Sequence, residues 1–383
     1  MMMKIKMTII ATAVTMAAAL TACTTSVSAV ANRDTTVNNN NLTVENGKDI
    51  TIDTAGKYVL TGKADGASVI IDASDEDNVE LVLDGLVITN KDKPCIYVRN
   101  ADKVSVTLSG DNSLSVTGEF GSDGDTNTDA VIFSKDDIVF DGDGSLVLDS
   151  SDNGIACKDT LEVAGGDIRI GCKGSGLESK DEIVFSDGSI NITACNDGLH
   201  AEDDDDDSKG SVIIEGGILN VNADDDAIHA TTTASINGGQ ISLTGAEGIE
   251  GTVVYVNGGN INIEASDDGI NAAHKSDTLS PLFEMNDGTV IIKMAEGDTD
   301  GIDSNGDIVI NGGTIDITGR STFDYDGKAE VNGGTIIENG TETNTVTNQM
   351  MGGPGQMGGH GPMGEPGQMG GHGQMGGPKG MPH

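Results

Sequence analysis

The sequence predicts an all-β fold, a single-stranded parallel β-helix of about a dozen coils. Three observations predict it. Related fragments recur about every 22 residues, apolar and polar residues alternate within the fragments, and the chain combines 55 glycines with only 3% aromatic residues and no tryptophan. Self-similarity at a fixed period is the signature of a solenoid, and the narrow interior of a small coil has little room for large aromatic side chains.

The repeats follow one template. An Asp-Gly-Ile element is followed, after a gap, by a run of β-branched residues, and then an Asn-Gly-Gly element is followed by Ile-x-Ile. The first marker glycine recurs at steps of 22, 22, 29, 21, 21 and 32 residues, with alanine at one copy. Polar insertions at 202–210 and 274–281 account for the longer steps. The first marker falls at Gly154, Gly176, Gly198, Ala227, Gly248, Gly269 and Gly301, and the second at Gly166, Gly188, Gly217, Gly239, Gly259, Gly288, Gly313 and Gly334.

Alternation within the repeats selects strands over helices. Ile190–Ile192, Ile241–Leu243 and Ile261–Ile263 each place a polar residue between two apolar ones, the period-two pattern of a half-buried strand. A strand rises about 3.3 Å per residue, so 22 residues suffice for three short strands per coil. We expect the Gly-Gly and Asp-Gly glycines to form positive-φ corners, with successive coils paired in parallel about 4.8 Å apart.

The amino terminus predicts export. Lys4 and Lys6 precede an apolar stretch, residues 9–20, that is shorter than the roughly 20 residues of a membrane span and is typical of a secretory signal. It ends in Leu20-Thr21-Ala22-Cys23, which looks like a bacterial lipoprotein box. We therefore expect residues 1–23 to be a signal peptide and Cys23 to be lipidated, anchoring the protein at the membrane or cell surface. Ordinary cleavage near Ala29 or Ala31 is the alternative.

Three further segments follow. Residues 24–41 are predicted to be a flexible tether, and 42–348 the β-helix. Residues 349–383 are Met/Gly/His/Pro-rich repeats that hold seven of the fourteen methionines; we expect this tail to be disordered. The tail is either a flexible segment without a specific ligand or a site for a soft metal such as Cu(I).

The formal charge of −41 restricts the possible partners. It repels nucleic acid and anionic lipid, so we expect contact with membrane only through the lipid anchor, and a monomer. The same charge favours divalent cations. Any anionic ligand would need intervening cations.

Acidic and amide residues recur around the Asp-Gly-Ile element, so stacking would align them along one corner. Carboxylates about 5 Å apart repel by roughly 3 kcal/mol at an effective dielectric of 20, and calcium takes six to eight such oxygens. The alternative is that these residues form turns and solvated surface. We predict Ca²⁺ as cofactor, with candidate ligands Asn196, Asp197, Asp225, Asp226, Glu247, Glu250, Asp267, Asp268, Asp300 and Asp303.

Histidine and cysteine leave alternatives open. His200 and His229 fall on adjacent coils, either as zinc ligands or, the interpretation we favour, as outward side chains on a solvated face. Cys172 and Cys195 differ by one position in register and are either free buried thiols or a disulfide.

Several phrases in order resemble a known family of exported carbohydrate-binding domain-containing parallel β-helix proteins, similar in fold to calcium-dependent pectate lyases. They are Asp84–Asn90, Phe133–Asp137 and Asp197–Asp203 with the poly-Asp run to Asp207. The resemblance covers about residues 45–340. It implies a right-handed β-helix, bound calcium and affinity for plant cell-wall polysaccharide, notably polygalacturonate, without cleavage.

We therefore expect a cell-surface protein that recognises acidic polysaccharide through calcium bridging. A neutral glucan would favour exposed aromatic platforms, and the chain has only four tyrosines and no tryptophan. One alternative is a calcium-dependent polysaccharide lyase acting by β-elimination, with a lysine base drawn from Lys135, Lys158 and Lys180. Each of these is followed by aspartate, which favours an ion pair over a base, so we propose no catalytic residue. The other alternative is a structural spacer or adhesin with structural calcium only.

Overall fold

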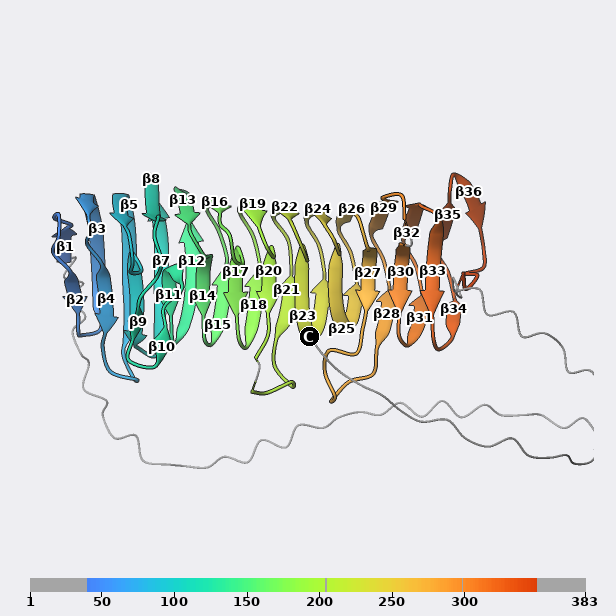
Figure 1. The fold of residues 1–383 in the computed structure, drawn as a ribbon, viewed down its shortest axis with the longest axis horizontal. Coiled ribbons are helices and arrows are strands. Elements are labelled where there is room, and N and C mark those ends of the chain that lie inside the picture. The colour runs from blue at the N-terminus through green and yellow to red at the C-terminus, as the bar shows by residue number, and fades with distance from the viewer. Residues whose placement is uncertain (1–39, 204, 298, 350–383) are drawn as a thin grey trace, which may run out of the picture. The chain divides into compact units, whose positions relative to one another are not determined.

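A computed structural model describes residues 40–203, 205–297 and 299–349, and the regular structure in these ranges is entirely β. The strands stack side by side along one axis, in chain order (Figure 1). Nearly all pairings are parallel, which confirms the predicted parallel β-helix. The signal peptide with Cys23, residues 24–39 of the tether, and the tail after Gln349 lie outside the described residues.

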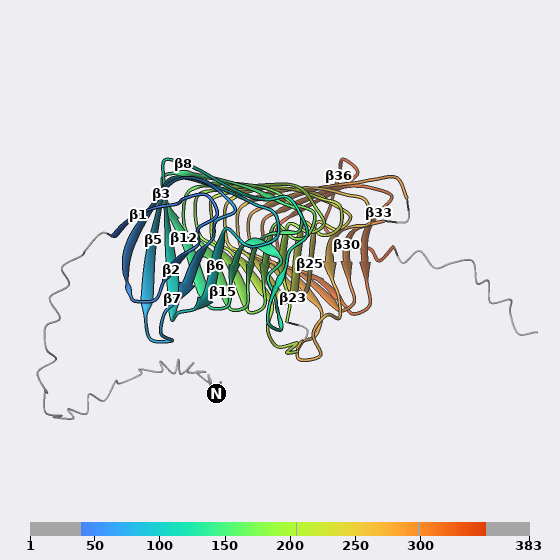
Figure 2. The same ribbon diagram turned by 60° about the vertical axis from the view of Figure 1, so that its left-hand side comes forward.

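Each coil turns through three strands, so the stack has three faces. Figure 2, turned by 60°, shows the coils behind one another. We call the face that carries the Asp-Gly-Ile element the ladder sheet, and the next two faces along each coil the second and third sheets. The long strands β3 (Gly56–Asp65) and β5 (Asn78–Asn90) bend from the second sheet into the third. Similarly, β23 (Ile228–Ile236) and β25 (Ile249–Val256) bend from the ladder sheet into the second.

The remaining strands are assigned by their pairings. The ladder sheet contains β2 (Ile50–Ile52), β4 (Val69–Asp72), β6 (Ile96–Asn100), β11 (Ala130–Ser134), β14 (Asn153–Cys157), β17 (Leu177–Ser179), β20 (Leu199–Ala201), β27 (Asp268–Ala272), β30 (Asp300–Ser304) and β33 (Ser321–Tyr325). The second sheet contains β1 (Asn40–Thr43), β7 (Lys103–Ser109), β12 (Asp137–Gly142), β15 (Thr160–Val163), β18 (Glu182–Phe185), β21 (Ser211–Ile214), β28 (Leu282–Met285), β31 (Asp307–Ile310) and β34 (Ala329–Val331). The third contains β8 (Asp111–Val116), β13 (Ser145–Ser150), β16 (Asp167–Gly171), β19 (Ser189–Cys195), β22 (Ile218–Ala223), β24 (Gln240–Gly245), β26 (Asn260–Ala265), β29 (Thr289–Met294), β32 (Thr314–Thr318), β35 (Thr335–Glu338) and the antiparallel β36 (Thr341–Thr343). A small hairpin, β9 (Ser122–Asp123) and β10 (Thr126–Asn127), projects between β8 and β11.

The two marker glycines have different roles. The second marker has positive φ at every copy, for example 97° at Gly188 and 98° at Gly239, as predicted for a corner. The prediction of the same role for the first marker is wrong: Gly248 has no positive φ and directly precedes β25. A Cβ there would lie 2.4 Å from the carbonyl oxygen of Gly269 and 2.4 Å from Ile263 Cγ2. These glycines are therefore required by close approach between coils and to the core.

The core is a continuous stack of isoleucine, leucine and valine side chains inside the coils, with phenylalanines such as Phe140 and Phe185 fully buried. Exposure alternates clearly in strands such as β29, where Ile292 is 1% exposed and Ile291 44%. At the Asn-Gly-Gly corner, the asparagines bond to one another from coil to coil, as in Asn257 Nδ2 to Asn237 Oδ1 at 2.8 Å and Asn286 Nδ2 to Asn257 Oδ1 at 2.8 Å. The asparagine of the Asn-Gly-Gly element is thus explained by the hydrogen bonds that it makes between successive coils.

The open alternative for the cysteines is resolved in favour of a disulfide. Cys172 and Cys195 are joined, with Cα atoms 4.8 Å apart. The one-residue mismatch in their register is absorbed by an irregularity after Thr193, where β19 slips against β22. Cys95 and Cys157 are buried free thiols. Within the described ranges, no helix has the length and apolarity to cross a membrane.

Candidate ligand-binding face

One side chain from each successive coil lines up on the outer face of the ladder sheet. We call this row the outward ladder. Its neighbours in each strand, such as Ile155 and Leu177, enter the core, so alternation places the row outside. The pairing confirms the column that the Asp-Gly-Ile spacing predicts from Ala156 to Asp303, and extends it in both directions. Its members are Ile70, Tyr97, Phe133, Ala156, Glu178, His200, His229, Glu250, Asn271, Asp303 and Asp324.

The ladder begins with aromatic rings covered by cations. Tyr97 and Phe133 pack edge to face with centroids 5.8 Å apart and form, with two alanines, an apolar cluster separate from the core. Arg99 Cζ lies 5.2 Å and Lys135 Nζ 6.0 Å from the Tyr97 centroid, and Lys158 Nζ lies 5.5 Å from that of Phe133. Because Tyr97 is only 5% exposed, the charged groups rather than the rings face a ligand here.

A shallow groove of about 180 Å³ adjoins these rings, lined by Lys93, Tyr97, Arg99 and the β9–β10 hairpin. The hairpin is tied to the sheet through Asp123, whose Oδ2 accepts hydrogen bonds from Tyr97 Oη and Arg99 Nε, both at 3.0 Å. The tyrosine hydroxyl is the largest cause that lowers the pKa of Asp123. The groove therefore combines cations with carboxylates: Lys93 Nζ lies 2.6 Å from Asp49 Oδ1, and Arg99 pairs with both Asp72 and Asp123.

The centre of the ladder is a pair of stacked histidines. The rings of His200 and His229 lie 4.6 Å apart at an angle of 10°. His229 Nδ1 lies 2.8 Å from Glu250 Oε2 and 3.1 Å from Asp226 Oδ2. Burial opposes the charged ring, but these two carboxylates outweigh burial and raise the pKa of His229 to about 9.

The favoured expectation of solvated, outward histidines is therefore only half right. Both side chains point outward, but His229 is 7% exposed and His200 is partly buried. His200 Nδ1 lies 3.1 Å from Asp197 Oδ2, and its Nε2 lies 3.1 Å from Glu202 Oε2. Burial disfavours protonation of His200 as well, yet its pKa is raised because the Asp197 carboxylate outweighs burial.

Next along the ladder, an insertion reaches over the acid pair Glu247 and Glu250. Lys275 Nζ lies 2.8 Å from Glu250 Oε1, and Asn271 Nδ2 donates to both Glu247 oxygens at 3.2 Å. Burial raises the pKa of Glu247, and the neighbouring Glu250 carboxylate adds to it. The pKa of Glu250 is lowered, because His229 and Lys275 outweigh its burial. The charge of Glu250 is therefore compensated by His229 and Lys275, whereas the raised pKa of Glu247 favours its protonated, uncharged form.

The two insertions meet beside the ladder. Asp277 N donates to Asp207 Oδ2 at 2.9 Å, and in Figure 1 both loops extend from the same edge of the stack, after β20 and after β27. Lys275 was missed by sequence reasoning, because nothing in the spacing shows that an insertion folds back onto a coil. The poly-Asp insertion contacts the ladder sheet through Asp203, whose Oδ1 lies 2.9 Å from Lys180 Nζ.

The ladder ends in carboxylates. Asp268 and Asp300 are partners on adjacent coils, as are Asp303 and Asp324. Burial raises the pKa of Asp268 to about 7, with Asp303, Asp267 and Asp300 adding to it, and burial with Asp324 raises that of Asp303 to about 6. We call Asp268, Asp300, Asp303 and Asp324 the acidic end. It is a crowded set of carboxylates, and in Asp268 and Asp303 burial and the neighbouring carboxylates both disfavour the charged form.

The predicted calcium ligands separate into three places. Asp226 and Glu250 gather around His229, Asp197 holds His200, and Asp268, Asp300 and Asp303 belong to the acidic end. Among the described residues, three or more ionisable ligand groups come within 4.8 Å of one another only as His200–Glu202–His229 and Asp226–His229–Glu250. The other four predicted ligands belong to none of the three places: Asn196, Asp225, Glu247 and Asp267.

The acidic end fits calcium by the chemistry of its donors. Its four carboxylates are oxygen ligands, and Asn271, which neighbours Asp303 in the outward ladder, adds a buried amide oxygen without a hydrogen-bond partner. Calcium binds carboxylate and amide oxygens. Asp226 and Glu250 fit it less well, because His229 and Lys275 already compensate their charge.

Two of the three recurring lysines form ion pairs, as the ion-pair interpretation predicts. Lys158 Nζ is 3.4 Å from Glu178 Oε1, and Lys180 Nζ pairs with Asp203. Lys135 instead lies over Tyr97.

Comparison with known proteins adds three findings. A family model described as "Carbohydrate-binding domain-containing protein" matches residues 46–299 and 244–350. A curated protein of the same description from Acetivibrio thermocellus is 33% identical over 128 residues, which are 32% of this chain and 45% of that protein, so the match spans less than half of that relative. The solved structure of a polysaccharide lyase-like protein from C. thermocellum, a gadolinium derivative, aligns over 76% of this chain and 99% of that chain, with 23% identity and a TM-score of 0.46.

Proposed function

Because this chain belongs to the carbohydrate-binding domain-containing protein family, we propose that it binds an acidic polysaccharide along the outward ladder, with calcium held at the acidic end. The observation that carries the proposal is the ladder itself. It presents one side chain per coil in unbroken register from Ile70 to Asp324, with coils about 4.8 Å apart. An extended polymer lying along this row meets a new side chain at each coil.

The two ends of the ladder suit different contacts with a uronate polymer. At the aromatic end, Lys135 can meet a polymer carboxylate directly. Arg99 can do so by exchanging one of its present partners, Asp72 and Asp123, since arginine binds carboxylate through two parallel hydrogen bonds. At the acidic end the polymer would be repelled, unless calcium bridges its carboxylates to Asp268 and Asp303. The raised pKa values of these two groups support a need for a cation there.

The proposed location is the outer surface of an exporting cell, reached through the lipoprotein box at Cys23. The Cys172–Cys195 disulfide supports this, because disulfides persist in oxidising compartments outside the cytosol.

Affinity electrophoresis of the purified protein in gels containing polygalacturonate or a neutral glucan tests the proposal. We expect retardation by polygalacturonate that strengthens with calcium, and none by the glucan. Arg99→Ala and Asp303→Asn should each reduce retardation. Arg169→Ala and Asp316→Asn change like charges in the third sheet, away from the ladder, and serve as matched controls.

Absence of retardation in both gels would favour a structural spacer and refute the proposal. Equal retardation by both polymers would refute its acidic specificity. Ultraviolet absorbance of unsaturated products during incubation with polygalacturonate would replace it with the lyase alternative.

A further inference from the structure

The stacked histidines have an arrangement that stacking alone does not require. Each ring has its Nδ1 next to a carboxylate three residues earlier in the chain: His200 beside Asp197 and His229 beside Asp226, both at 3.1 Å. The same relation on two successive coils fixes both rings in the same orientation. It leaves both Nε2 atoms for another partner.

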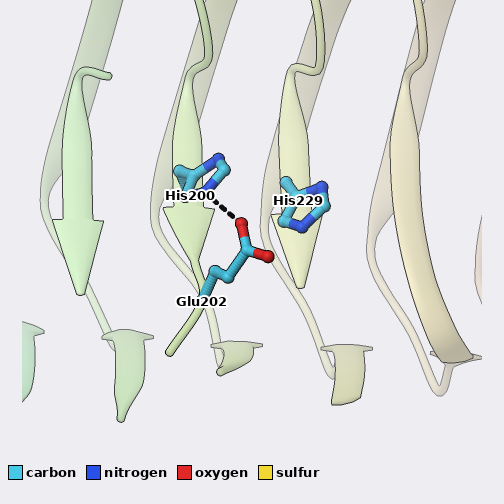
Figure 3. Close-up of side chains that lie close together, drawn as sticks. All are labelled: His200, Glu202 and His229. Carbon is cyan, nitrogen blue, oxygen red and sulfur yellow. Dashed lines mark hydrogen bonds and ion pairs between the residues drawn. The ribbon is translucent and has the colours of Figure 1, made fainter. Parts of the chain in front are cut away.

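The Nε2 atoms of His200 and His229 have different neighbours. His200 Nε2 lies 3.1 Å from Glu202 Oε2, which comes from the start of the poly-Asp insertion (Figure 3). His229 Nε2 is buried and has no hydrogen-bond partner, on a side chain that is only 8% exposed. An unpaired buried ring nitrogen is costly, so its position beside a second imidazole and a carboxylate needs an explanation.

We propose that His200, His229 and Glu202 form a binding site for a divalent transition metal of the zinc class. Their ligand atoms lie within 4.8 Å of one another. Ligands of tetrahedral zinc, with bonds of about 2.0–2.1 Å, lie roughly 3.3 Å apart. The rings are stacked 4.6 Å apart at 10°, so they must rotate out of the stack for both Nε2 lone pairs to point at one ion. Two imidazoles and one carboxylate would fill three of the four coordination positions of the ion and leave the fourth open.

The carboxylates behind the rings complete the arrangement. Histidines that bind metal donate their other ring N–H to a carboxylate or carbonyl, which fixes the tautomer and orients the ring. Asp226 Oδ2 accepts this hydrogen bond from His229 Nδ1 at 3.1 Å. Glu250 Oε2 lies 2.8 Å from the same nitrogen, and Asp197 Oδ2 lies 3.1 Å from His200 Nδ1, both as ion-pair partners. These three are positioning residues and do not touch the metal.

The donor atoms separate this site from the calcium proposed at the acidic end. Imidazole nitrogen suits zinc, copper, iron and nickel, whereas calcium prefers oxygen alone. The two sites belong to different coils and share no ligand. The transition-metal site therefore stands whether or not the chain binds polysaccharide.

Calorimetric titration of the full chain with zinc chloride, in excess calcium chloride, tests the site. We expect one saturable zinc site per chain that calcium does not displace and that the double variant His200→Ala, His229→Ala lacks. The tail contains three further histidines, His360, His372 and His383, and any zinc bound there persists in the double variant. His274→Ala removes an exposed histidine of the second insertion and should bind zinc as the unaltered chain does.

Two milder variants keep the test decisive if the double variant unfolds. Glu202 is 43% exposed, so Glu202→Gln should leave the fold intact, checked by circular dichroism, and weaken zinc binding at least tenfold. Asp226→Asn should weaken it about 10- to 100-fold. Cobalt titration should give visible absorption bands that these variants lose. Zinc binding unchanged in the double variant or in Glu202→Gln, or abolished by calcium, would overturn the proposal.

Discussion

His229 Nδ1 and Glu250 Oε2 lie 2.8 Å apart on neighbouring coils, with side chains only 8% and 5% exposed. Few buried charges in the described stack are so closely paired. Removing His229 leaves Asp226 and one oxygen of Glu250 without their cation, and only Lys275 still pairs with Glu250. Breaking such a buried arrangement is far more costly than loss of a surface ion pair.

His229→Ala should therefore destabilise the protein by about 3–5 kcal/mol at pH 7 in EDTA, measured by urea unfolding. The pKa of His229 is about 9 in the folded chain, above the value of an unperturbed histidine. Its contribution is thus fully present below about pH 6.5 and lost as the pH rises through 9. The difference from the unaltered chain should shrink by pH 10. His274→Ala, at an exposed site, should change stability by less than about 0.5 kcal/mol; an equal loss in both variants would contradict the buried pair.

The acidic end should make metal-free stability fall as the pH rises. The folded pKa values of Asp268 and Asp303, about 7 and about 6, exceed those of unfolded aspartate. Their stabilising protonation is complete below about pH 4 and lost as the pH rises through 6 to 7. In EDTA the melting temperature should therefore be higher at pH 5.5 than at pH 8, and calcium should raise it more at pH 8.

Substitution at the acidic end checks the cause of this pH dependence. Asp268→Asn should reduce both the pH dependence and the response to calcium, while Asp316→Asn in the third sheet should leave both unchanged. A melting temperature that ignores EDTA at pH 8 would argue against calcium at this place.

Neighbouring isoleucines in β29 separate the core from the surface. Ile292 is 1% exposed and Ile291 44%. Ile292→Ala should cost about 2–5 kcal/mol because it leaves a cavity between coils, and Ile291→Ala less than about 0.5 kcal/mol. Chemical unfolding of the two variants measures both values, and similar losses would mean that the register of β29 is misplaced.

Gly248 lies at a first-marker position where a side chain should be destabilising, unlike the position that holds Ala227. Gly248→Ala places a Cβ against the Gly269 carbonyl oxygen and Ile263, so it should cost about 1–3 kcal/mol through overpacking. The control is Gly171→Ala, where the nearest atom, Thr193 O, would be 4.0 Å from the new Cβ. This change should be neutral or slightly stabilising. Calorimetric melting of both variants compares them directly, and a neutral Gly248→Ala would show that the coils can separate locally.

Much of the candidate site followed from spacing alone. Because every coil contributes one residue to each column, a repeat of about 22 residues is enough to align His200, His229 and Glu250, and the pairing places them in that order. The spacing could not show which residue each of these side chains contacts. Nothing in it shows that Asp197 and Asp226 turn toward histidines, which removes them from a simple calcium column.

The sequence by itself determined the architecture: parallel coils, their period, the positions of the insertions and the residues that share the outward ladder. These follow from alternation and periodicity, which are local properties of the chain. Only the tertiary structure decided the contacts, burial and charge compensation of the individual side chains. Lys275 reaches Glu250 from an insertion, Cys195 reaches Cys172 through an irregularity in β19, and His229 loses its solvent. The physical reason is that burial and charge compensation depend on how loops fold over the face, and no repeat encodes that.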